Sequence, residues 1–264
     1  MLRHWRERRS IVITVTWTAL VFTLAAMQSA LADPHGAAVL ERIRKYHNEL
    51  KDLSSSFSVE DENTDALSKI SPDFAQFVKY GFRDFHYYYK NPDKVRIESN
   101  ATLFGLLKGI SIRNGGHKNF FVPKWGIHKT ADVTGQSNKK ETALDFGLIA
   151  GDLWNDYAIW FIRSEKDNGR VTYVIGLRPQ NEPHGGTMVV RVDADTMRVC
   201  ERDRYGMDGA ITQREYFSNY LHPLPHLWIP TVIRLFNGSG QFGGDLVYTH
   251  VAVNAGLPDS LFTG

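Results

Sequence analysis

The stretch that most constrains how this chain can fold runs from Gly186 to Phe217. Apolar and polar residues alternate from Met188 to Asp193, with the period of two that a half-buried strand requires. A second such run covers 197–202, a turn follows at Gly209, and a third run covers 210–217. Three consecutive antiparallel strands cannot stand alone, because their apolar face must be buried against other elements. The rest of the chain must therefore supply a cover.

The N-terminal segment has the three parts of a secretory signal peptide. Four arginines within residues 3–9 precede an apolar run from Ile11 to Met27, and Ala30-Leu31-Ala32 fits a cleavage site. We expect cleavage after Ala32, so that residues 33–264 form one mature domain in the periplasm. The alternative is an uncleaved membrane anchor, but the apolar run is short for one and the cleavage site follows it at once.

Charge and cysteine content narrow the classes of partner. Residues 1–32 hold four Arg and one Glu, so the mature chain carries 27 basic and 28 acidic residues and a formal net charge of −1. This balance gives no electrostatic footprint for nucleic acid. Cys200 is the only cysteine, which excludes an intramolecular disulfide. We expect a monomer with neither a nucleic-acid partner nor a cofactor.

Two helices are predicted to cover the sheet. Apolar residues recur at helical spacing from Val39 to Leu53 with charged residues between them, and Asp33 suits the position before the first turn. A second, strongly apolar helix is predicted over 144–154. Helices with apolar undersides could act as a lid over a lipid site. The residues expected on the lid are Leu40, Ile43, Tyr46, Leu50, Leu144 and Leu148.

The remaining mature chain reads as predominantly β. A first strand is predicted over 54–61, and the strand pattern is strong from Phe82 onwards. Pro72 argues against a strand within the mixed segment 70–80. The polar, irregular stretch 123–140 is typical of a mobile surface loop. We count eleven or twelve short strands joined mainly by hairpins, so the sheet should be antiparallel.

Alternation also indicates which strand residues share an apolar inner face. Such a face either lines a water-free cavity or packs a solid core, and alternation does not distinguish the two. A lipid needs the cavity, in which each buried methylene contributes about 0.8 kcal/mol. The candidate inner-face residues are Phe85, Tyr87, Tyr89, Val95, Ile97, Ile110, Ile112, Tyr173, Ile175, Leu177, Met188, Val190 and Val192.

Several stretches, taken in order, resemble the LolA/LolB superfamily of outer-membrane lipoprotein-sorting proteins. They are VLERIRKYHNELKDLSSSFSV, YYYKNPDKVRIES, YVIGLRP, VVRVDADTMRVCERDRYGMDG, WIPTVIRL and VNAGLPDSLF, and their succession covers nearly all of the mature chain. The resemblance implies a mainly β (α+β) fold. It would be an unclosed, curved antiparallel β-barrel of about eleven strands with helices across its open side.

The same resemblance implies a function. Proteins of this family hold the acyl chains of lipoproteins against the apolar inner face and do no covalent chemistry, so we do not expect an enzyme. Acylated cargo would come from an inner-membrane complex and pass to an outer-membrane acceptor. An arginine locks the lid in LolA, and Arg83 and Arg96 are the candidates here. The alternative is an envelope sensor or structural protein of the same fold, similar to RseB, that binds a protein partner.

Three further features favour structural roles over chemistry. His222 and His226 flank a Pro-Leu-Pro loop, but no third metal ligand lies near them in sequence. His184 precedes two glycines, as in an esterase oxyanion hole, yet the chain has no G-x-S-x-G motif. Cys200 lies within a predicted strand and has no nucleophile signature around it. Nothing in the sequence suggests a convergent set of catalytic groups.

Overall fold

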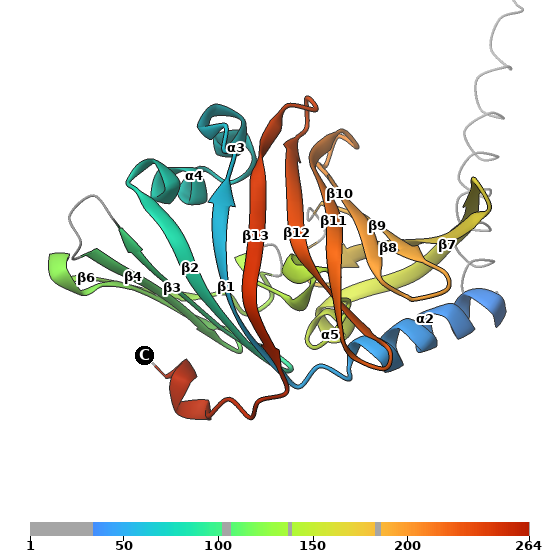
Figure 1. Ribbon diagram of the computed structural model, residues 1–264, viewed down its shortest axis with the longest axis horizontal. Coiled ribbons are helices and arrows are strands. Elements are labelled where there is room, and N and C mark those ends of the chain that lie inside the picture. Colours follow the sequence, from blue (N-terminus) through green and yellow to red (C-terminus); the bar gives the residue numbers. More distant parts are fainter. Residues whose placement is uncertain (1–33, 102–106, 137–138, 183–185, 264) are drawn as a thin grey trace, which may run out of the picture.

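The computed structural model describes residues 34–263 apart from 102–106, 137–138 and 183–185. The described residues form one sheet of thirteen strands in the order β6-β5-β4-β3-β2-β1-β13-β12-β11-β10-β9-β8-β7 (Figure 1). Every neighbouring pair is antiparallel. Within the described residues the end strands β6 and β7 do not pair with each other, so the barrel is open. The predicted fold class is confirmed, with thirteen strands rather than about eleven.

Pairing of β1 with β13 joins two wings of the sheet. We call β1–β6 the early wing and β7–β13 the late wing. The strands are β1 (Asp52–Glu60), β2 (Phe82–Lys90), β3 (Lys94–Ala101), β4 (Leu107–Asn114), β5 (His117–Val122), β6 (Ile127–Asp132), β7 (Tyr157–Asp167), β8 (Arg170–Pro179), β9 (Met188–Asp193), β10 (Val199–Tyr205), β11 (Ile211–Leu224), β12 (Leu227–Asn237) and β13 (Phe242–Val253).

The first predicted helix is present but shorter than expected. Helix α2 (Pro34–His47) ends before Leu50, which lies in the following turn. Leu53 belongs to β1, where it pairs with Tyr89 on one side and Val253 on the other. The helical spacing of these last two leucines is therefore misleading. Leu53 is placed by strand pairing, which no local pattern reveals, and Leu50 lies in the turn that leads to the strand.

Two short helices occupy the segment that the sequence left unassigned. The side chain of Asn63 caps α3 (Thr64–Ile70) by accepting a hydrogen bond from the Ala66 amide at 3.1 Å. Ser71 caps α4 (Pro72–Lys79) in the same way, and Pro72 takes the first helical position, where its missing N–H costs nothing. Pro72 thus starts a helix as well as opposing a strand.

The prediction of a mobile loop over 123–140 is wrong for much of its length. A 3₁₀ turn, η2 (Pro123–Trp125), leads into β6, which pairs with β5 over its whole length. The side chains of β6 are almost all exposed, because this strand lies at the edge of the sheet. An exposed polar edge strand has no apolar alternation, so no pattern in the sequence indicates it.

The second predicted helix is also wrong, because two glycines interrupt it. The 3₁₀ helix η4 (Ala143–Phe146) stops at Gly147, which has a φ of +76°. The short helix α5 (Leu153–Asp156) begins only after Gly151, whose φ is +64°. A Cβ on Gly151 would lie 2.3 Å from the Pro92 carbonyl oxygen, so the chain there needs a glycine.

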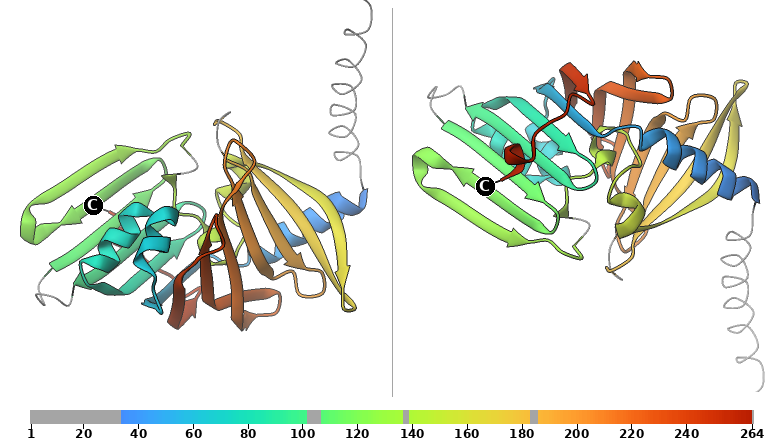
Figure 2. Two further views of the ribbon diagram at one scale, coloured as in Figure 1. Left: turned by 90° about the horizontal axis from the view of Figure 1, so that it is seen from above. Right: turned by 90° about the horizontal axis from the view of Figure 1, so that it is seen from below.

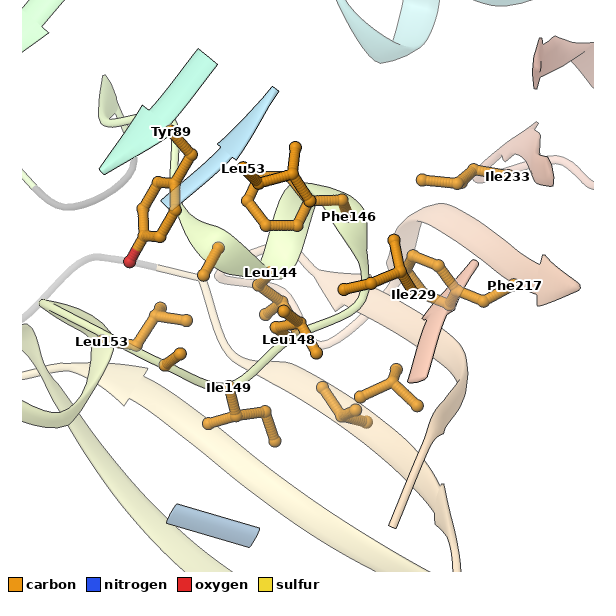
Figure 3. Packing of buried hydrophobic residues seen from close by; sticks show 14 of the residues in the cluster. Leu53, Tyr89, Leu144, Phe146, Leu148, Ile149, Leu153, Phe217, Ile229 and Ile233 are labelled. Carbon is orange, nitrogen blue, oxygen red and sulfur yellow. The ribbon is translucent and has the colours of Figure 1, made fainter. Parts of the chain in front are cut away.

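Topology explains why this apolar segment lies where it does. Because β6 and β7 are opposite edges of the sheet, the connection between them must travel from one wing to the other. It runs between the wings (Figure 2), and we call residues 141–156 the plug segment. Its buried side chains lie between Leu53 and Tyr89 of the early wing and Phe217 and Ile229 of the late wing (Figure 3).

The outer face of the sheet is held by charges and by the C-terminal tail. Arg191 and Arg214 pair with Glu201 and Asp203 on neighbouring strands of the late wing. The tail, which ends in the 3₁₀ helix η5 (Asp259–Phe262), lies against β3 and β4 of the early wing. Neither feature touches the inner face, where the apolar residues are concentrated.

Candidate functional site

All but two of the predicted inner-face residues lie on the same side of the sheet. Directly paired residues in an antiparallel sheet point to the same face, and residues two apart along a strand do so as well. The pairing therefore traces one face from the early wing to the late wing through Phe57, Tyr248, Ile233, Phe217 and Arg202. The predicted residues on this inner face are Phe85, Tyr87, Tyr89, Val95, Ile97, Tyr173, Ile175, Leu177, Met188, Val190 and Val192.

Ile110 and Ile112 face the other way, which corrects the sequence assignment. Ser111 pairs with the inner-face residue Ile97, so its two isoleucine neighbours point outwards. Ile112 is buried there, on the side where η5 packs against β4. Apolar residues at alternate positions reveal a strand, but they do not show which face of the sheet those residues occupy. Here the alternating isoleucines are covered by η5 on the outer face, and this gives the same pattern as an inner-face strand.

Helix α2 covers the inner face of the late wing. A Cβ on Gly36 would lie 2.9 Å from the Phe161 side chain, which shows how closely the helix approaches β7. Of the predicted lid residues, Ile43 and Leu50 are fully buried, while Leu40 and Tyr46 are partly exposed against the core. The helix thus presents an apolar underside to the sheet, as predicted.

His47 fastens the end of α2 to two other segments. Its Nδ1 accepts a hydrogen bond from the Ile149 amide at 2.9 Å, so its Nε2 carries the proton and donates to the Met197 carbonyl at 2.8 Å. Burial lowers the pKa of His47 to about 4, although its bond to Met197 acts in the opposite direction. The imidazole is therefore neutral at neutral pH, and it ties α2, the plug segment and the turn before β10 together.

The plug segment covers the centre of the inner face. Leu144 and Leu148, the other predicted lid residues, are fully buried, as are Ile149 and Leu153 (Figure 3). Phe146 packs edge-on against Tyr87 and Tyr89, with ring centroids 5.1 and 5.4 Å apart. In this arrangement the chain itself packs the apolar face as a core.

Arg113 clamps the plug segment to the early wing. Its guanidinium is fully buried and donates to the Asp152 carboxylate at 3.0 Å and to the Glu141 carbonyl at 2.5 Å. Burial raises the pKa of Asp152 to about 6, and the charge of Arg113 offsets only part of this rise. One of the Asp152 carboxylate oxygens has no partner among the described residues.

The two arginines suggested for a lid lock lie elsewhere. Arg83 pairs with Glu62 beside α3, and Arg96 binds Glu98 and the Leu261 carbonyl on the outer face. Of the three arginines, Arg113 is the one that binds the plug segment. Sequence reasoning missed it because it lies between the two isoleucine positions and the turn at Asn114, within a strand whose phase was misassigned.

An aromatic row on the early wing is only partly covered. Phe74 of α4 lies 5.6 Å from Phe85, and Phe85 stacks on Phe57 at 4.7 Å. Phe77 of α4 contacts Phe82 and Phe120 at 5.2 and 5.6 Å between ring centroids. Phe74, Phe77 and Phe120 keep partial exposure, so apolar surface remains accessible beside the short helix.

The late wing carries a cluster of charges on its inner face, which the sequence did not suggest. Arg202 is buried and binds Glu215 with two hydrogen bonds of 2.7 and 2.6 Å. It also donates to Asp145 of the plug segment at 3.2 Å. Arg204 lies 3.6 Å from Asp145. The only available signal was that Glu215 shares the strand phase of buried Phe217. A bulge between Val199 and Glu201 turns Arg202 and Arg204 inwards, so alternation counted from Val199 would place them on the outer face.

The pKa shifts of the two arginines differ in direction. Burial alone would lower the pKa of Arg202, but Glu215 and Asp145 raise it above its ordinary value. Burial and the charge of Arg202 lower the pKa of Arg204, and the same two carboxylates do not offset them. The nearby carboxylates thus outweigh the effect of burial at Arg202 but not at Arg204.

Other features noted in the sequence have structural partners. His222 stacks on Trp228 at 4.0 Å, while His226 stacks on Tyr46 at 4.2 Å, so the two imidazoles are engaged separately. Burial raises the pKa of the Cys200 thiol, which disfavours the reactive thiolate. His184 lies outside the described residues, as does the predicted signal peptide. Among described residues, no three His, Cys, Asp or Glu side chains are grouped to hold a metal ion.

A pocket of about 250 Å³ opens at one end of β11 and β12, away from the apolar face. Arg214, Tyr216 and Phe236, which contribute to its lining, point to the outer face. Arg214 is already held by Asp203 at 2.6 Å. The inner face therefore remains the candidate site. No helix of the described chain is both long and apolar enough to cross a membrane.

Comparison with known proteins places the fold. No family model and no curated protein sequence matches the chain. Among the solved structures that match, three have a TM-score of 0.60 and 14% identity to this chain. A DUF1329 family protein from Desulfovibrio piger aligns over 85% of this chain and 94% of its own. A domain assigned to the outer membrane lipoprotein-sorting proteins, from Vibrio parahaemolyticus, aligns over 87% and 96%, and a LolA superfamily protein from Nitrosomonas europaea over 87% and 97%.

Proposed function

We propose that this chain, which shares the fold of LolA superfamily proteins, is a periplasmic carrier that binds lipid acyl chains on its inner face. Its cargo would be lipoproteins destined for the outer membrane, received from an inner-membrane complex and passed to an outer-membrane acceptor. The observation that carries the proposal is a continuous apolar face covered by α2 and the plug segment, neither of which pairs with a strand. Such covers can separate from the sheet without breaking its ladder.

An exchange of the plug segment for an acyl chain is close to balanced in free energy. Exposing the five large apolar side chains of the plug segment would cost about 10 kcal/mol, at about 2 kcal/mol each. Burying an acyl chain of about sixteen carbons would recover about 12 kcal/mol at 0.8 kcal/mol per methylene. The open form without ligand would therefore be rare, and a bound chain would sustain it. The five side chains are Leu144, Phe146, Leu148, Ile149 and Leu153.

The first measurement is native mass spectrometry of the protein purified from its own periplasm, followed by extraction of bound lipid. Its N-terminal mass also tests cleavage after Ala32 and the periplasmic location. Bound phospholipid or acylated protein at a defined stoichiometry would support the carrier. A protein that is empty and takes up no fluorescent fatty acid would leave the envelope sensor or structural protein, similar to RseB, as the better account.

A pair of variants tests whether the plug segment competes with ligand. Phe146→Ala should lower the free energy of unfolding by about 3–5 kcal/mol, as expected for a buried Phe. It should nevertheless tighten binding of a fluorescent fatty acid by about tenfold, because less apolar surface must be displaced. Chemical denaturation and fluorescence titration measure the two effects.

The matched control is Ile112→Ala, which removes a buried side chain from the outer face. It should destabilise the protein by about 2–4 kcal/mol without tightening binding. If both variants change the affinity equally, the plug segment does not compete with ligand.

A further inference from the structure

We propose that the ligand of the inner face is an anionic amphiphile whose charged head is bound by Arg204. This inference rests on the proposed acyl-chain carrier and specifies its ligand. Three observations support it: Arg202 is held by more hydrogen bonds than its neighbour Arg204, an apolar row leads to these two arginines, and the nearby carboxylates already accept hydrogen bonds.

The guanidinium of Arg202 is fully used. Two of its nitrogens bind Glu215, a third binds Asp145 at 3.2 Å, and only 4% of its side chain is exposed. A bidentate pair of this kind fixes both partners in place. Arg202 therefore serves as a support for the cluster and has no group to offer a ligand.

Arg204 lies two residues further along the same inner face, and its ion pair with Asp145 is a loose one. Its guanidinium makes no hydrogen bond to any described residue, and its closest carboxylate oxygen, on Asp145, is 3.6 Å away. Its Nε is buried without a partner, while 34% of the side chain remains exposed. A guanidinium offers five N–H donors, and a buried donor without an acceptor is costly, so an incoming acceptor would be favoured.

The apolar row of the early wing leads towards this cluster. From Phe85 and Phe57 it continues to Tyr248 of β13, whose ring lies 5.2 Å from Phe57. Tyr248 shares the inner face with Leu246, which pairs with Ile233, and the same face continues along β11 to Glu215, which pairs with Arg202. One face thus joins an apolar strip to a polar end, the pattern that an amphiphile requires.

The carboxylates of the cluster favour an anionic head over a cationic one. Glu215 accepts two hydrogen bonds from Arg202. Asp145 accepts from Arg202 through one oxygen and from the Thr142 amide, at 2.7 Å, through the other. Both acids are therefore engaged, and the spare capacity belongs to Arg204. A planar carboxylate or a phosphate suits its fork of donors.

The test compares matched ligands that differ in the charge of the head. Oleate is titrated against oleyl alcohol, and oleoyl lysophosphatidylglycerol against monooleoylglycerol, with the full exported protein and calorimetry or fluorescence as readout. Wild type should bind the charged member of at least one pair about tenfold more tightly. A preference within the first pair indicates a carboxylate head, one within the second a phosphate head, and both together a general anion site.

Variants assign the preference to Arg204. Arg204→Gln should remove it while leaving binding of the uncharged ligands unchanged. Arg163→Gln, at an exposed arginine of β7, should keep it. Should Arg204→Gln fail to fold, Arg204→Lys keeps the charge but loses the fork, and it should reduce the preference several-fold.

Two results would overturn the inference. Equal binding of charged and uncharged ligands by wild type, or a preference that is undiminished in Arg204→Gln or in Arg204→Lys, would exclude the anion site while leaving the acyl-chain carrier intact. Failure of all four ligands to bind would instead reject the carrier itself, and the headgroup site with it.

Discussion

The two wings of the sheet are built alike from antiparallel hairpins but are covered differently. The early wing has a short helix, α4, over an aromatic row, and Phe77 and Phe120 remain partly exposed. The late wing has the longer helix α2 over a surface of mixed aromatic and aliphatic residues, next to a charged cluster centred on Arg202. The difference teaches that strand pattern sets the sheet, whereas the covering segments decide what each part of its inner face can do.

The wings also differ in how their covers are fastened. On the late side a neutral imidazole, His47, holds α2 to the plug segment and to the turn before β10. On the early side a buried ion pair between Arg113 and Asp152 holds the plug segment. Burial lowers the pKa of His47 and raises the pKa of Asp152. Acidification should therefore change the free energy of unfolding in opposite directions through these two residues.

The largest expected effect tests the charged cluster of the late wing. Glu215→Ala leaves the Arg202 charge buried with only Asp145 beside it, and should lower the free energy of unfolding by about 3–5 kcal/mol. Urea denaturation measures the loss. The double variant Arg202→Met with Glu215→Met should restore most of it, because it removes the charge instead of isolating it. A double variant no more stable than the single one would contradict this account.

Acidification should separate the fastenings of the two wings. The pKa of His47 is about 4 in the folded chain against 6.5 in the unfolded one, so the unfolded chain binds more protons between these values and stability decreases as the pH is lowered. From pH 7 to pH 5 this costs about 2 kcal/mol. The pKa of Asp152 is raised to about 6 from 3.8, so its contribution has the opposite sign and returns about 1 kcal/mol over the same range.

His47→Asn isolates these contributions. Without the imidazole, only the contribution of Asp152 remains of the two. Wild type should lose stability between pH 7 and pH 5, whereas the variant should gain about 1 kcal/mol over the same range. Chemical denaturation at both pH values measures the difference. If the stability of wild type and variant depends on pH in the same way, His47 does not contribute to the pH dependence as proposed.

The smallest stability effect should come from the exposed part of the early wing. Phe120→Ala removes a partly exposed ring and should cost about 1 kcal/mol, less than a fully buried Phe. If the early wing receives the acyl chain, binding of a fluorescent fatty acid should weaken several-fold. Leu40→Ala on α2 removes a comparably exposed residue over the late wing and should leave that binding unchanged. If the two variants weaken binding of the fatty acid equally, the proposed difference between the wings is wrong.

The part of the site that could be predicted from sequence is the part with a local period. The alternation from Met188 to Val192 placed those residues correctly beside Ile175 and Leu177. Ile110 and Ile112 show the same alternation but face outwards, because the C-terminal tail gives the outer face its own apolar cover. Arg113, Arg202 and Arg204 were missed because a charged residue in a strand normally indicates a solvated face.

The sequence by itself determined an antiparallel, mainly β sheet with an N-terminal helix over it, since strand and helix periods and turn residues act over a few neighbouring positions. Only the tertiary structure decided where the apolar segment 144–154 lies and which charges point inwards. That decision belongs to topology: β6 and β7 are opposite edges of one sheet, so the chain between them must cross from wing to wing. In this position the plug segment supplies hydrogen-bond partners for the buried guanidinium groups of Arg113 and Arg202. No local pattern encodes partners that are distant in sequence.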